Sequence, residues 1–218
     1  MRIRLDEQLT QLNAKLIEMS TMVKKAISDA TEALIRQDIE AAKRIMAADD
    51  DIDAMEKEIE RLCLQVILQQ QPVARDLRFV SAILKIITDL ERIGDHASDI
   101  SEFTQYLTGK PFIKKMDHIP MMADLTMIMV TESIEAFVNR DLKLAKKVIT
   151  KDDEVDELFL LVKTELIELI NEDASNGDQA LDLMMVTKYY ERIGDHATNV
   201  AEWAVFSLTG THKDSQIM

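Results

Sequence analysis

The chain has 218 residues, enough for one large domain or for two domains of about 100 residues each. With only 5 Gly, 3 Pro and 5% aromatic residues against 47% hydrophobic residues, its composition favours long helices around a packed core. It argues against a β protein and against a disordered chain. The formal net charge of −14 excludes the broad basic face that duplex DNA requires, so we expect cations or a basic protein surface as partners and no nucleic acid.

The single cysteine and the absence of long apolar runs bear on the cellular compartment. Cys63 lies within an apolar helical pattern, so we expect a buried, unreactive thiol rather than a nucleophile. A lone thiol fits a reducing cytosol. The N-terminal sequence lacks the continuous apolar segment of a signal peptide, and no apolar run reaches the roughly 18 residues of a membrane span. We therefore expect a cytoplasmic protein that does not insert directly into a membrane.

The same sequence pattern occurs twice in the chain. The heptapeptide ERIGDHA stands at 91–97 and again at 191–197. Upstream, DIEAAKRIMAADDDID from Asp38 matches DLKLAKKVITKDDEVD from Asp141. The copies are 103 residues apart at the aspartates and 100 apart at the heptapeptide, so the second copy lacks three residues, most simply in a loop. This spacing predicts a tandem repeat.

Each predicted repeat, residues 1–110 and 111–218, contains the signals of three helices. In chain order, the first helix covers about 6–36, the second follows an N-cap at Asp38 and stops before Pro72, and the third covers about 74–107 with a C-cap at Gly109. The second repeat has Asp141 as N-cap, NEDASNGD as its loop and Gly210 as its terminal cap. The sequence therefore predicts an all-α fold of two tandem, pseudo-symmetric three-helix bundles.

The third helix of each repeat carries an acidic stripe. At about 100° per residue, Glu91, Asp95 and Asp99 fall on one side of the helix, and the apolar residues lie opposite, so we expect the stripe to face outward. The second helix adds Asp49 and Asp53, again four residues apart. Two acidic pairs spaced by four residues thus occur in each repeat.

The acidic pairs of the two helices should meet in space. Asp53 and Glu91 are equally far from Pro72, as are Asp49 and Asp95, and a helical hairpin places such residues at one level. The second repeat shows the same matching about its own loop. The complete set of predicted metal ligands is Asp49, Asp53, Glu91, Asp95, Asp99, Asp152, Asp156, Glu191 and Asp195.

Four carboxylates in one groove repel one another, and cations relieve the repulsion. Oxygen ligands suit magnesium, manganese and calcium, and clusters of carboxylates also bind iron; zinc is a further candidate. The sequence does not decide which metal binds. The alternative interpretation is a solvated acidic face neutralised by ion pairs to Arg92 and Arg192.

The heptapeptide contains two further residues of interest. Gly94 and Gly194 lie in the middle of a helix, which predicts close packing against a neighbouring helix and a narrow groove between the acidic pairs. His96 and His196 lie about 100° around the helix from the preceding aspartates, outside the ligand register. We expect them to lie beside the ligands or to face solvent.

These motifs resemble those of the PhoU family, accessory regulators of high-affinity phosphate uptake in bacteria. The resemblance rests on two ERIGD motifs, each preceded by an Asp-x-x-x-Asp pair, and on QPVARDLR in the first repeat, and it covers almost the whole chain. It implies two three-helix bundles with surface metal clusters bound by Asp49 with Asp53, Glu91 with Asp95, and their counterparts. Asn199 replaces the acid of Asp99 in the second repeat, so that site should hold fewer or more weakly bound ions.

The resemblance also implies partners and a role. The protein would couple the ATPase of a phosphate-specific ABC transporter to a membrane-bound sensor histidine kinase and restrain phosphate-starvation signalling. We expect no enzyme, because the sequence shows no nucleophile–base arrangement, no phosphate-binding glycine loop and no Walker motif. A carboxylate-bridged metal-dependent enzyme and a metal-storage or scaffold protein remain the alternatives, and a homodimer stays open.

Overall fold

The computed structural model describes residues 2–212 and 215–216, and the side chains from residue 4 to residue 212. The elements of this part are α1 Arg2–Arg36, α2 Ile39–Gln70, α3 Arg75–Leu107, α4 His118–Val138, α5 Leu142–Glu172, the 3₁₀ turn η1 Ala174–Asn176, α6 Gly177–Thr209, β1 Thr211–His212 and β2 Ser215–Gln216. The short strands β1 and β2 pair antiparallel. The predicted all-α fold of tandem three-helix repeats is confirmed. No helix among the described residues combines the length and apolar character needed to cross a bilayer.

The helix boundaries follow from local chemistry. The Asp38 side chain accepts a hydrogen bond from the Ala41 amide, and Asp141 does the same for Lys143 and Leu144, so both predicted N-caps are confirmed. Helix α2 ends as predicted before Pro72, which cannot continue a helix.

One predicted helix start and one predicted cap were wrong. Helix α1 begins about one turn earlier than predicted, because the partly buried Leu5 in this added turn packs against the core. Helix α3 ends at Leu107 as predicted, but its cap is Thr108 in extended conformation and not Gly109, whose φ of +92° provides the left-handed turn that follows. Gly210 caps α6 as predicted, with its amide donating to the Phe206 carbonyl.

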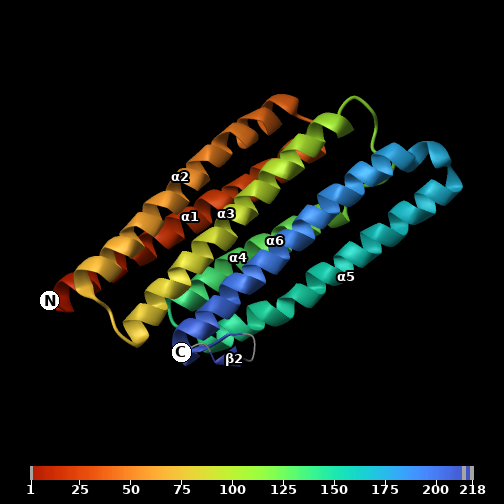
Figure 1. Ribbon diagram of the computed structural model, residues 1–218. Helices are drawn as coiled ribbons and strands as arrows, with labels where there is room; N and C mark the ends of the chain where they lie inside the picture. The colour runs from red at the N-terminus through yellow and green to blue at the C-terminus, as the bar shows by residue number, and fades with distance from the viewer. Residues whose placement is uncertain (1, 213–214, 217–218) are drawn as a thin grey trace.

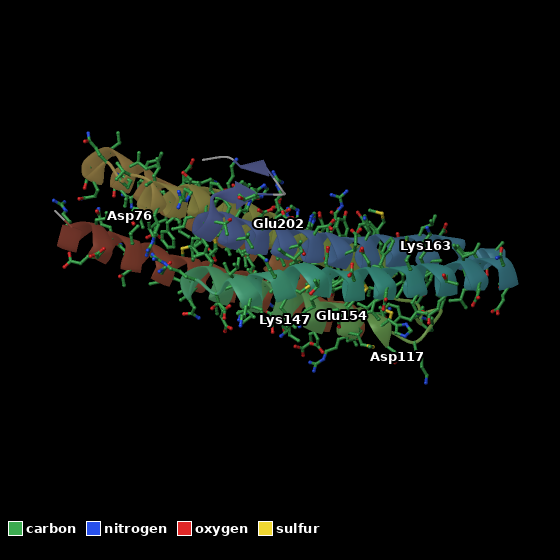
Figure 2. The ribbon with its side chains drawn as sticks, turned by 90° about the horizontal axis from the view of Figure 1, so that it is seen from below. Asp76, Asp117, Lys147, Glu154, Lys163 and Glu202 are labelled. Carbon is green, nitrogen blue, oxygen red and sulfur yellow. The ribbon has the colours of Figure 1, made fainter. Side chains whose placement is uncertain are left out.

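The two repeats lie side by side, as Figure 1 shows. Helices α3 and α6 run antiparallel through the middle, with α1 and α4 behind them and with α2 and α5 along the two outer edges. In the view of Figure 2, α6 lies above α4, and the two helices pack against each other. Among the described residues, α2 packs only against α1 and α3, and α5 only against α4, α6 and η1. The four inner helices therefore join the repeats.

One continuous hydrophobic core spans both repeats. The Thr31 and Tyr190 hydroxyl groups hydrogen bond at 2.7 Å between α1 and α6, and Phe79 stacks on Phe137 with ring centroids 4.7 Å apart between α3 and α4. Cys63 is buried, and burial raises the pKa of its thiol to about 12, which fits the predicted inert thiol. The proposed division between residues 110 and 111 lies in the segment that joins α3 to α4, and it stays a prediction.

Candidate metal centre

The groove between α2 and α3 collects three carboxylates. Oxygen atoms of Asp53, Glu91 and Asp95 all lie within 4.8 Å of one another. The antiparallel hairpin that turns at Pro72 brings them to one level, as their equal distances from the turn predict. This spacing places three oxygen donors around a volume that one cation could occupy.

The carboxylates face away from the apolar core as expected, but they lie in a partly buried groove. The Glu91 side chain is only 17% exposed, and the side chains of Asp53 and Asp95 are partly buried. The reason is that α2 covers one edge of the stripe. Two exposed basic residues pair with the acids at its rim: Arg92 with Asp95 at 2.8 Å and Lys57 with Asp53 at 3.3 Å. The predicted ion pairing of Arg92 is confirmed, but an acid excess remains.

Asp49 shows how strongly the acids crowd one another. Burial and the negative charges of Asp95 and Asp53 raise the pKa of its carboxyl to about 6. Burial and the Asp95 charge also raise the pKa of Glu91, despite the opposing charge of Arg92. Burial and mutual repulsion thus make it unfavourable for all carboxyl groups of the groove to be ionised together, and a bound cation would reduce that repulsion.

Asp99 lies at the edge of this group. Its Oδ2 lies 3.3 Å from His96 Nδ1, and its charge adds to the repulsion at Asp49, but it is not one of the three converging acids. The imidazole next to it provides a local partner that the helical wheel did not reveal.

The second repeat has similar crowding without the same convergence. Burial and the charges of Asp195, Asp156 and Glu191 raise the pKa of Asp152 to about 6. One oxygen of Glu191 pairs with Lys188, and the other is buried without a hydrogen bond. Within the described residues, however, the group of three acids at ligand distance occurs in the first repeat and not here. The expectation of a weaker second site stays a prediction.

The mid-helix glycines allow α2 and α5 to come close to the acidic helices. A Cβ on Gly94 would lie 2.9 Å from Ile52 Cδ1 and 3.2 Å from an Asp49 carboxylate oxygen. On Gly194 it would lie 3.0 Å from a carboxylate oxygen of Asp152. The predicted close packing is confirmed, and in both repeats it presses an aspartate of the neighbouring helix against the glycine.

We expect Gly94→Ala to destabilise the protein by about 1 kcal/mol, because the contacts with Ile52 and Asp49 outweigh the gain in helix propensity. Urea denaturation measures the change. Gly177→Ala is the control, since nothing lies within 4 Å of its Cβ position at the start of α6, and it should be neutral or stabilising. A Gly94→Ala protein as stable as Gly177→Ala would contradict the close approach.

The two histidines lie between the repeats, so the expectation that they face solvent was wrong. The His96 and His196 rings are 5.5 Å apart where α3 crosses α6, and both are largely buried. His196 Nδ1 lies 2.8 Å from Asp89 Oδ1, which also accepts a hydrogen bond from the Asn199 amide at 3.1 Å. Packing of α3 on α6 covers the imidazoles, and this contact between distant segments left no signal in the sequence.

Sequence reasoning missed Glu56 and Thr88 beside the acids, and Asp89 beside His196. Glu56 adds negative charge beside Glu91 and accepts a hydrogen bond from Thr88. Glu56 and Thr88 are equally far from Pro72, so the rule of matched levels could have found them. Asp89 had no comparable signal, because its counterpart in the second repeat is Tyr189.

The raised pKa values of Asp49 and Asp152 predict a pH dependence in protein treated with a chelator. An acid whose pKa is raised by folding stabilises the fold below its unfolded pKa, and that stabilisation is lost as the pH rises through about 6. After allowance for solvent screening we expect a loss of about 1–2 kcal/mol between pH 5 and pH 7.5. Urea denaturation at both pH values measures it. Asp49→Asn should remove about half of the loss, whereas stability that rises over this interval would contradict the prediction.

The sequence and the fold of the chain are similar to those of known proteins. The family model of the PhoU domain matches it twice, over residues 16–104 and 119–204. The phosphate-specific transport system accessory protein PhoU homolog of Clostridium acetobutylicum is 40% identical over 210 residues, which cover 96% of each chain. The chain belongs to the PhoU family. A PhoU homolog of Aquifex aeolicus is 42% identical over 87% of this chain and 86% of its own length.

Solved PhoU structures have the same fold. The crystal structure of PhoU from Pseudomonas aeruginosa superposes with a TM-score of 0.89 at 32% identity, covering 94% of this chain and 99% of that one. The phosphate transport system regulatory protein PhoU from Streptococcus pneumoniae gives 0.88 at 26% identity, covering 97% and 100%. The family resemblance inferred from the ERIGD motifs is therefore confirmed over nearly the full length of the PhoU-family chain.

Proposed function

We propose that this chain is a non-enzymatic regulator of phosphate uptake and phosphate-starvation signalling that acts in the cytoplasm. It would be a metal-binding adaptor between the ATPase of a phosphate ABC transporter and a sensor histidine kinase. The supporting observation is the match over nearly the full length with relatives named as accessory proteins of phosphate-specific transport systems. The Streptococcus pneumoniae neighbour is likewise titled a regulatory protein of phosphate transport.

The acidic grooves suit a cation in this role. In the first repeat Asp53, Glu91 and Asp95 would hold the ion, with Asp49 beside them, and their purely oxygen donors favour iron, manganese or magnesium over softer metals such as zinc. In the second repeat the corresponding ligands would be Asp152, Asp156, Glu191 and Asp195. The bound cation supplies charge neutralisation. With their charge neutralised, these acidic residues would hold α2 against α3, and α5 against α6.

Docking would use the exposed faces of the helices. The outer helices α2 and α5 pack only within their own repeats among the described residues, so their outward faces are available to partners. A chain with net charge −14 should associate with basic partner surfaces, and ionic strength should weaken that association.

Deletion of the gene tests the regulatory role. We expect starvation genes to remain expressed when phosphate is abundant, measured as transcript levels in a strain with no second PhoU gene. Complementation with the unaltered gene should restore repression. Normal repression in the deletion strain at high phosphate would contradict the proposal.

An activity assay separates the regulator from the metal-dependent enzyme. We expect the purified protein to show no oxidase and no phosphatase turnover with added Fe²⁺ or Mn²⁺. Turnover that disappears in the Glu91→Gln variant would instead assign catalysis to the acidic groove.

A further inference from the structure

The two repeats differ in the groove between their first two helices. In the second repeat, Glu132 of α4 pairs with Lys147 at 2.9 Å and with Lys151 at 3.4 Å, both from α5. Burial alone would raise the pKa of Glu132, but the hydrogen bond from Lys147 and the charges of both lysines hold it below its usual value. The Lys151 side chain is only 14% exposed. Lysine side chains thus close this groove.

The same positions are filled differently in the first repeat. The Asp38 amide donates to the Ala33 carbonyl just as the Asp141 amide donates to Ala136, so the 103-residue offset holds through this turn. The offset places Asp29, Arg44 and Ala48 where the second repeat has Glu132, Lys147 and Lys151. Ala48 has no side chain that could reach α1.

Neither of the other two equivalents closes the groove. Asp29 pairs with Lys25 of its own helix, and the Lys25 side chain is 75% exposed. Among residues 4–212, whose side chains are described, Arg44 makes no hydrogen bond and no ion pair. No ion pair therefore crosses from α2 to α1 at this level.

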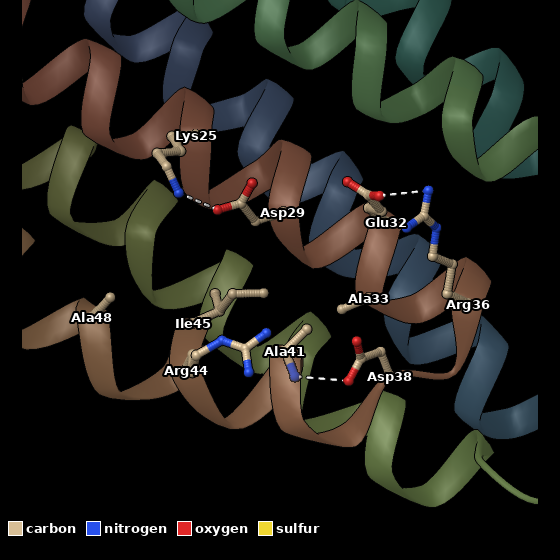
Figure 3. Close-up of a pocket in the computed structure, with 10 residues that line it drawn as sticks. All are labelled: Lys25, Asp29, Glu32, Ala33, Arg36, Asp38, Ala41, Arg44, Ile45 and Ala48. Atoms are coloured by element: carbon tan, nitrogen blue, oxygen red, sulfur yellow. Dashed lines mark hydrogen bonds and ion pairs between the residues drawn. The ribbon is translucent and has the colours of Figure 1, made fainter.

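The groove of the first repeat is consequently open. It holds a cavity of about 510 Å³ between α1 and α2, with the Lys25–Asp29 and Glu32–Arg36 pairs along one rim and Arg44 and Ala41 along the other (Figure 3). A second cavity of about 270 Å³ adjoins it and reaches Gly94 and Asp49; the two share Lys25, Asp29, Ile45 and Ala48.

The lining of this second cavity, which we call the inner cavity, favours a particular kind of chemical group. Met22, Ala26, Ile45 and Ile52 provide apolar walls for an alkyl chain. Even without Asp49, which lies beside the proposed metal site, the acids Asp29 and Asp51 outnumber the single base Lys25, so a terminal cation is favoured there over an anion. An exposed ion pair within one helix, such as Lys25 with Asp29, contributes little free energy, so Lys25 competes only weakly for the Asp29 carboxylate.

We propose that this groove receives a lysine or arginine side chain from a basic segment of a partner protein. The side chain takes the place that Lys151 fills in the second repeat: its alkyl part lies along Ile45 and Ala48, and its cation pairs with Asp29. The proposal does not depend on metal binding or on the role in phosphate signalling.

Titration with hexalysine, followed by methyl NMR, tests the groove directly. We expect the methyl resonances of Met22, Ile45 and Ile52 to shift on addition of the peptide at physiological ionic strength. The equivalent methyl groups of Leu125, Val148 and Val155 in the closed groove should stay in place. Hexaglutamate and inorganic phosphate should shift neither set. Hexalysine shifts spread over both sets, or shifts of the first set with phosphate, would overturn the proposal.

Four variants test the groove further. Ala48→Lys fills the groove and should weaken hexalysine binding about tenfold relative to Ala47→Lys, which adds the same charge on the neighbouring exposed residue outside the lining. Asp29→Asn should also weaken binding, whereas Lys151→Ala should open the second groove and make the Val148 methyl groups respond. Equal affinities of the Ala48→Lys and Ala47→Lys proteins would overturn the assignment.

Discussion

Replacing Glu91 by Gln together with Asp95 by Asn is expected to weaken Mn²⁺ binding by about 100-fold while the helix content stays unchanged. The reason is that two of the three converging oxygen donors lose their charge, and no core contact is removed. Calorimetric titration measures the affinity, and circular dichroism measures the helix content. Relief of carboxylate repulsion should leave the metal-free protein at least as stable as the wild type.

The control is Glu168→Gln with Glu172→Gln, which removes the same charge from an exposed pair spaced by four residues on α5. It should leave Mn²⁺ affinity within about twofold, because exposed charges act only through the weak general field. The Glu191→Gln, Asp195→Asn protein should retain the site of the first repeat. If Glu91 and Asp95 can be neutralised without loss of affinity, the acidic stripe is a solvated face and not a metal centre.

Truncating Phe137 to Ala is expected to reduce the free energy of unfolding by about 3–5 kcal/mol. Phe137 is fully buried and stacks on Phe79, so its loss leaves a cavity between α3 and α4 where the two repeats meet. Because one core spans both repeats, we expect a single cooperative transition in urea for the wild type and for the variant.

Ile128→Ala on the same helix is the matched control, since Ile128 is 44% exposed and its truncation should change stability by less than about 0.5 kcal/mol. Two separate transitions in Phe137→Ala would show that the repeats unfold independently. If Phe137→Ala reduced the free energy of unfolding no more than Ile128→Ala does, that result would contradict the tight packing between Phe137 and Phe79.

Local patterns were sufficient for much of the fold. The caps at Asp38 and Asp141 and the break at Pro72 act within a few residues, so the sequence alone located these helix ends. Where a pattern was incomplete, the prediction was wrong: α1 starts earlier because Leu5 gains its packing from the core formed with other helices.

Part of the candidate site was also predictable, because a helical hairpin with a fixed turn sets the level of every residue along it. This rule paired Asp53 with Glu91, and Gly94 indicated the close approach of α2. It would also have paired Glu56 with Thr88. It did not reveal how deep the groove is, since burial depends on how the helices rotate against each other.

The sequence by itself determined the tandem repeat, three helices in each copy and the pairing of acids within a hairpin, because all of these depend on periodicity and on contacts across one turn. Only the tertiary structure decided that three acids converge in the first repeat alone among the described residues, and that His96 and His196 lie buried between α3 and α6. It also decided that Lys151 closes one groove while Ala48 leaves the other open. These features depend on side-chain distances between separate helices, which small rotations and shifts change and which repetition in sequence does not encode.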